Sequence, residues 1–107
     1  MEARRLRHVA LQRRKEVKAL LRRQIPVAQR VVGDNDELTL MMRMTYAEAL
    51  YEDEGVTLGD LREAVNTLEE TTRTARRVFG GAHPLAAAIK EELRFARPAL
   101  SARETPP

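Results

Sequence analysis

The sequence has no cysteine and no tryptophan, and among its 107 residues only two Phe, two Tyr and two His supply aromatic rings. Without cysteine the chain can form no disulfide, no thiolate zinc site and no thiol nucleophile. His8 and His83 are the only imidazoles, which leaves almost nothing for a Ser-His-Asp triad or a multi-histidine metal site. We therefore predict that the chain is not an enzyme, and that it has no catalytic, cofactor-binding or metal-binding residues.

Glycine and proline are also scarce, at five residues each, which argues against a turn-rich β-sandwich. No apolar run approaches the roughly 18–20 residues that span a bilayer. The arginine-rich start includes two Glu and no Ser, so it makes a poor transit peptide. What is present, 43% hydrophobic and 33% charged residues, is typical of one small helical domain. We expect an intracellular protein, soluble or held in a complex, without a membrane span or a small-molecule substrate.

Charge is strongly segregated along the chain, although the formal total is only +3. Residues 1–33 carry a balance of +8, residues 34–70 a balance of −9, and residues 71–107 a balance of +4. A basic segment beside an acidic one can bind an anionic partner, or the two can attract each other within the fold. We favour internal pairing or solvated helix faces over nucleic-acid binding.

Apolar residues recur at steps of three and four throughout, and this spacing predicts helices joined by short loops, with no strand. The first helix carries an apolar stripe that includes Leu6, Val17 and Val31. Proline inside a helix removes a hydrogen bond and crowds the preceding turn, so we expect Pro26 to kink the first helix and Pro98 to end the fourth. The four helices are predicted over residues 4–32, 36–52, 57–79 and 84–97.

Residue types at the predicted helix ends match known capping preferences. Asp36 is suited to the N-cap of the second helix, and Thr57 stands three residues before Asp60 as in a capping box. Pro84 fits the first position of the fourth helix. Gly33 and Gly80 can adopt the left-handed conformation that ends a helix.

The sequence repeats itself at an offset of 47 residues, which aligns residues 14–50 with residues 61–97. Eight of the 37 aligned positions are identical, and they include both glycines and the leucine five residues after each. We expect the two stretches to form similar helical elements. The identical pairs are Glu16/Glu63, Leu21/Leu68, Ala28/Ala75, Arg30/Arg77, Val31/Val78, Gly33/Gly80, Leu38/Leu85 and Ala49/Ala96.

Two segments resemble the tetratricopeptide repeat, in the variant found in kinesin light chains. Residues 39–51, Thr-Leu-x-x-Arg-x-x-Tyr-Ala-Glu-Ala-Leu-Tyr, look like the first helix of a repeat, and residues 79–84, Phe-Gly-Gly-Ala-His-Pro, resemble the junction to the next. The chain also looks like short tetratricopeptide proteins of unicellular algae. The resemblance implies an all-α fold of antiparallel helical hairpins stacked as a short solenoid of about four helices. Residues 1–13 would be a basic helical extension, residues 14–100 the repeat domain and residues 101–107 a frayed tail.

The same resemblance implies an inner face that binds protein partners. That face would include Met41, Met44, Glu48, Tyr51 and Phe95. Methionine suits a groove for apolar partner residues, although one or both of these Met could equally pack under the first helix. A chaperone-tail receptor would place Lys, Asn and Arg on this face instead.

The leading functional hypothesis is therefore a scaffold or adaptor module that binds protein partners, itself as a homodimer or other subunits of a larger assembly. The alternative is a small nucleic-acid-binding protein that uses residues 4–30. That segment has basic residues but no aromatic side chains for base stacking. Its basic patch comprises Arg13, Arg14, Lys15, Lys18, Arg22 and Arg23.

Overall fold

The computed structural model describes residues 2–53 and 55–105, and those residues form four helices without a strand. The prediction of an all-α fold is confirmed. The first helix is twice as long as the second. Their bounds are α1 Glu2–Val31, α2 Glu37–Tyr51, α3 Leu58–Phe79 and α4 Pro84–Glu104. Within the described ranges, no helix combines the length and the apolar character needed to cross a membrane.

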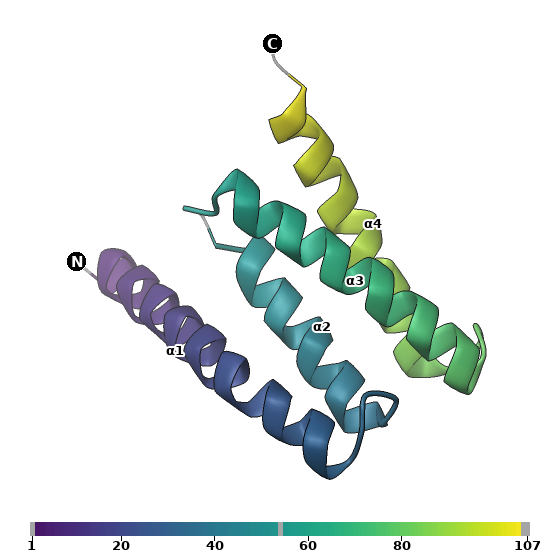
Figure 1. The fold of residues 1–107 in the computed structure, drawn as a ribbon. Coiled ribbons are helices and arrows are strands. Elements are labelled where there is room, and N and C mark those ends of the chain that lie inside the picture. Colours follow the sequence, from purple (N-terminus) through teal and green to yellow (C-terminus); the bar gives the residue numbers. More distant parts are fainter. Residues whose placement is uncertain (1, 54, 106–107) are drawn as a thin grey trace.

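Consecutive helices run antiparallel and pack side by side as hairpins (Figure 1). α2 is central, because it contacts α1, α3 and α4, whereas α1 contacts α2 alone among the described helices. The radius of gyration is 14.9 Å, against about 13 Å for a spherical domain of this length. The difference follows from α1, which reaches past the end of the shorter α2.

The two halves of the chain repeat their turn geometry at the predicted 47-residue offset. Gly33 and Gly80 both have positive φ, 97° and 88°. Three residues after each glycine, the side chain of Asp36 or His83 accepts a hydrogen bond from the backbone N–H two residues ahead. α2 begins at residue 37 and α4 begins at residue 84, in register. Thr57 caps α3 through Asp60 N–H, as predicted.

The hydrophobic core lies between α2, α3 and α4. Leu40, Leu50, Leu61, Leu68 and Ile89 are its largest fully buried apolar side chains. Small residues allow the helices to approach closely, and the alanines at positions 47, 64, 75 and 96 are all fully buried. Most of the predicted stripes of α2, α3 and α4 therefore lie inward.

The prediction that Pro98 ends the fourth helix is wrong, because α4 continues to Glu104. Pro98 is exposed, so the Arg94 carbonyl that it leaves without a helical partner can bind water. The extended end is held to α3 by Arg62 and Glu104, 3.4 Å apart, and by Arg103, whose guanidinium donates to the Val56 carbonyl. Residues 101–104 are thus helix, not tail; residues 106–107 lie outside the described range.

The first helix also continues through its proline. α1 is one helix across Pro26, and Pro26 is exposed. The kink expected there stays a prediction.

Candidate interaction surfaces

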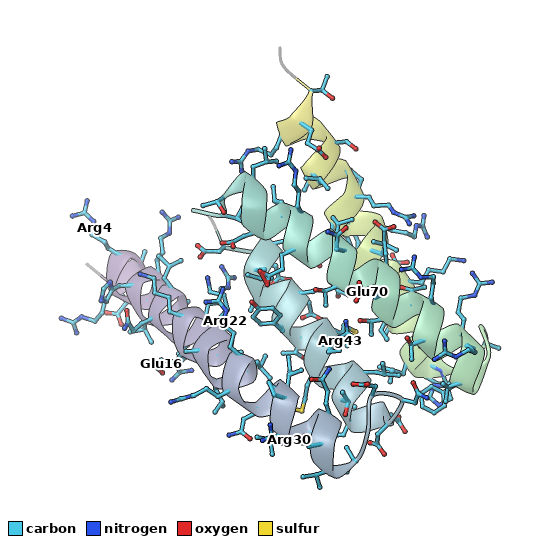
Figure 2. The ribbon with its side chains drawn as sticks, viewed as in Figure 1. Arg4, Glu16, Arg22, Arg30, Arg43 and Glu70 are labelled. Carbon is cyan, nitrogen blue, oxygen red and sulfur yellow. The ribbon has the colours of Figure 1, made fainter. Side chains whose placement is uncertain are left out.

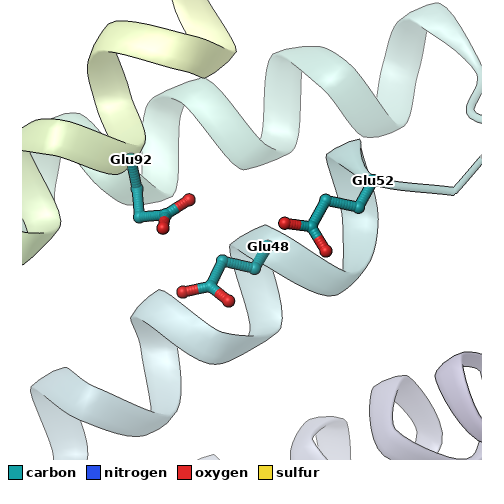
Figure 3. A group of neighbouring side chains, drawn as sticks. All are labelled: Glu48, Glu52 and Glu92. Atoms are coloured by element: carbon teal, nitrogen blue, oxygen red, sulfur yellow. The ribbon is translucent and has the colours of Figure 1, made fainter.

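An acidic cluster joins α2 to α4 (Figure 3). Glu48 lies on α2, and Glu52, the C-cap residue of α2, follows one turn later. Glu92 reaches them from α4, and carboxylate oxygens of the three all lie within 4.8 Å of one another. The Tyr51 hydroxyl donates a hydrogen bond to Glu92.

The cluster changes the acidity of its members. Burial, reinforced by the negative charges of Glu92 and Glu52, raises the pKa of Glu48 to about 7. Burial also raises the pKa of Tyr51, and its hydrogen bond to Glu92 raises it further. Glu48 is therefore partly protonated at neutral pH, which relieves the repulsion among the three carboxylates.

Replacing Glu48 by Gln should make the stability of the chain less dependent on pH. The folded chain holds the Glu48 proton up to about pH 7, whereas the unfolded side chain loses it near 4.5. A raised carboxyl pKa contributes stability that is full below the unfolded value and is lost as the pH rises through the folded value. Urea unfolding at several pH values between about 4.5 and 7 measures this effect. The free energy of unfolding of Glu48→Gln should increase relative to that of the parent chain as the pH rises. Glu91→Gln, at an exposed site on α4, is the control; a constant difference between Glu48→Gln and the parent would contradict the assignment.

Half of the predicted basic patch contacts the rest of the fold. Arg14 donates to the Glu52 carbonyl at 2.9 Å, and Lys18 lies 3.2 Å from the Asp53 carboxylate. The hydrogen bond from Gly55 N–H, and then Lys18, lower the pKa of Asp53. Arg22 donates to the Tyr46 hydroxyl at 2.9 Å. Of these contacts, the Lys18–Asp53 pair joins opposite charges of the basic and acidic segments.

Arg13, Lys15 and Arg23 form the other half of the patch and are exposed on α1. The basic residues of the patch therefore lie on two sides of α1. One side is occupied by α2, and the other side is open to solvent.

Tyr46 bridges three helices, a role that sequence reasoning missed. Its hydroxyl accepts from Arg22 of α1 and donates to Glu63 of α3 at 2.7 Å. The Arg22 guanidinium also lies 5.7 Å from the centre of the Tyr46 ring, between α1 and α2 (Figure 2). The sequence places Tyr46 on the inward stripe of α2, but only the packing of α1 and α3 on either side reveals the bridge.

Replacing Tyr46 by Phe should lower the free energy of unfolding by about 1–2 kcal/mol, because the buried ring stays while Arg22 and Glu63 lose their shared partner. Chemical denaturation of the variant measures the loss. A double-mutant cycle with Arg22→Met should show the two losses to be non-additive. Additive losses would mean that the two side chains do not act as one network.

The exposed apolar residues concentrate on α1. Its predicted stripe is mostly open, and only Ala28 is buried, with Leu21 and Ile25 partly buried against the core. Val31 is 75% exposed. The large exposed members are Leu6, Val9, Val17, Leu20, Val27 and Val31.

Two hollows follow the seam between α1 and α2. One, of about 500 Å³, lies toward the start of α1 and is bordered by Val17, Ala49 and Glu52. The other, of about 300 Å³, lies toward the end of α1 and is bordered by Val27, Val31 and Leu38. Periodicity marks the α1 stripe as apolar, but it cannot show that no helix covers it.

The five predicted inner-face residues have different environments. Met41 and Phe95 are 44% and 62% exposed. Met44 and Tyr51 are partly buried and pack against the core. Glu48 borders the larger hollow as well as the acidic cluster. The structure therefore joins Glu48 and Tyr51 through Glu92, a residue that sequence analysis did not select.

No protein family, curated protein or solved structure that was compared matches this chain.

Proposed function

We propose that the chain is a non-catalytic protein-interaction module, a small subunit or adaptor of a larger assembly built on tetratricopeptide-like helical hairpins. The open apolar stripe of α1 carries this proposal. Apolar patches of this kind on a folded domain commonly mark sites where another protein binds. Repeated helical hairpins support it further, because each one buries its apolar faces only by stacking on a neighbour.

The state of the basic patch supports a protein partner over a nucleic acid. Arg14, Lys18 and Arg22 already have partners within the fold. α1 has no Phe, Tyr or Trp to stack on bases. Contact with a phosphate backbone would not bury the apolar side chains of the α1 stripe.

Site-directed photo-crosslinking in cells that express the chain tests the proposal. A photoreactive residue at Val27 or at Phe95 should yield discrete crosslinked proteins. The same residue at Asn66, exposed on α3, is the control. Equal labelling from all three positions would contradict the proposal.

Binding to random duplex and single-stranded probes at about 50 and 200 mM salt tests the alternative. We expect weak binding that disappears at the higher salt. Submicromolar binding at the higher salt, lost on changing the exposed Arg13, Lys15 and Arg23 to Ser, would instead favour a nucleic-acid function.

A further inference from the structure

Two hollows lie along the seam between α1 and α2, and together we call them the α1–α2 groove. The α2 side of the two hollows is formed by residues 38, 42, 45, 48, 49 and 52, whose steps of three and four keep them on one side of the helix. The α1 side is formed by the exposed apolar stripe. A long, straight, apolar groove between two helices is the shape that a third helix fills.

By the internal repeat, this groove corresponds to the surface of α3 and α4 on which α2 packs. At the 47-residue offset, α1 and α2 are equivalent to α3 and α4, and the surface of α3 and α4 is covered by α2. α2 reaches α3 through Tyr46 to Glu63 and through Arg43 to Glu70, and it reaches α4 through Tyr51 to Glu92. The contact positions on α3 and α4 correspond to Glu16, Arg23 and Thr45; all three are exposed, and Thr45 borders the larger hollow.

Burial differs between the two surfaces as it should if one helix were missing. Ala64 and Thr71 of α3 are fully buried, whereas the equivalent Val17 and Gln24 of α1 are exposed. Leu85 of α4 is 7% exposed, whereas the equivalent Leu38 of α2 is 51% exposed. The groove is therefore a built helix-binding surface without its helix.

A second copy of the chain is a poor occupant. If α4 of another copy lay in the groove as α2 lies on α3 and α4, Arg94 and Arg97 would fall where the buried Ala47 and Leu50 lie. α1 of another copy would place two helices of balance +8 side by side. The first arrangement would bury two arginine charges, and the second would bring two positively charged helices together.

Charge points to an acidic helix instead. Glu70, which binds Arg43 of α2 at 2.9 Å (Figure 2), is replaced at the equivalent position of the groove by Arg23. Arg13, at the position equivalent to Asp60, borders the larger hollow and adds a second positive charge. An occupant therefore needs a carboxylate where α2 carries Arg43.

We infer that the α1–α2 groove binds an amphipathic helix of a partner protein, apolar on the face that fills the groove and acidic on the flank that meets Arg13 and Arg23. This inference rests on the proposed interaction function and names its site and the chemistry of the partner. The groove holds that helix as α3 and α4 hold α2, with the charge reversed at Arg23, the equivalent of Glu70, and kept at Glu16, the equivalent of Glu63.

The probe for this site is a lactam-bridged peptide with the sequence of residues 36–52 and the substitution Arg43→Glu. The matched control peptide keeps Arg43. Fluorescence anisotropy should show the substituted peptide binding the full chain about fivefold more tightly than the control peptide. The chain variant Arg23→Glu should reverse this preference, a result that nonspecific hydrophobic binding cannot produce.

Chain variants locate the binding. Val31→Asp combined with Leu38→Asp places two charges on exposed groove residues, so folding is preserved, as circular dichroism will verify, while peptide affinity should fall about tenfold or more. Val78→Asp, which changes the exposed residue of α3 equivalent to Val31, should leave affinity unchanged.

Equal affinity for both peptides, or no binding of either up to about 1 mM, would overturn the inference. So would loss of binding in Val78→Asp alone, which would move the site to α3 and leave the interaction function standing. Sedimentation that shows a dimer broken by the groove variants would identify a second copy as the occupant and also overturn it. Failure of the proposed function itself is a separate result, namely equal crosslinking from groove, α4 and control positions.

Discussion

Replacing Leu68 by Ala should lower the free energy of unfolding by about 2–5 kcal/mol, because it removes transfer energy and leaves a cavity. Leu68 lies fully buried in the cluster that joins α2, α3 and α4. A domain of this size has about 5–15 kcal/mol of stability, so the loss is a large fraction of the total. Urea denaturation gives the difference. Leu38→Ala, at an exposed leucine, is the matched control and should lose less than about 1 kcal/mol.

A similar loss in Leu68→Ala and Leu38→Ala would contradict the assigned core. It would mean that α3 does not lie between α2 and α4, and the repeat equivalence on which the groove depends would fall with it.

Replacing Ala47 by Leu should overpack the same core and cost about 1–3 kcal/mol. Ala47 is fully buried on α2, and the fully buried Ala64 of α3 belongs to the same cluster. The added methyl groups have no space unless the two helices separate. Thermal unfolding measures the shift, and Ala88→Leu at an exposed site of α4 should stay within about 0.5 kcal/mol of the parent. An unchanged midpoint for Ala47→Leu would place Ala47 outside the contact.

Helix ends could be predicted from the sequence because caps are local chemistry. Asp36, Thr57 and His83 precede their helices with side chains that accept backbone hydrogen bonds, and Gly33 and Gly80 supply positive φ. Each of these features needs only a few neighbouring residues, so no knowledge of the packing is required.

Pro98 shows where local reasoning stops. The cost of a proline inside a helix depends on whether water can satisfy the carbonyl that it leaves, and on what anchors the residues beyond it. In this chain the anchor for Glu104 is Arg62, 42 residues away. No pattern near Pro98 contains that information.

The candidate site was only partly predictable for the same reason. Spacing placed Glu48 and Tyr51 on one stripe, but Glu92 joins them across 41 residues from Tyr51. The periodicity of the sequence predicts the apolar stripe of α1. Its exposure depends on whether another helix packs on it, which the periodicity does not indicate. The offset of 47 residues was visible, and it is the signal from which the reversed charge at Arg23 could have been read.

Because α1 packs against α2 alone among the described helices, it can undock while α2, α3 and α4 keep their shared core. The chain therefore has two levels of cooperativity, since opening α1 costs only one interface whereas opening any other helix disrupts the core. A helix bound in the groove would stabilise the α1–α2 interface, because such a helix would contact α1 and α2 at once. Binding would then turn a loosely attached arm into part of a single cooperative unit, and partner concentration would set how much of the chain unfolds together.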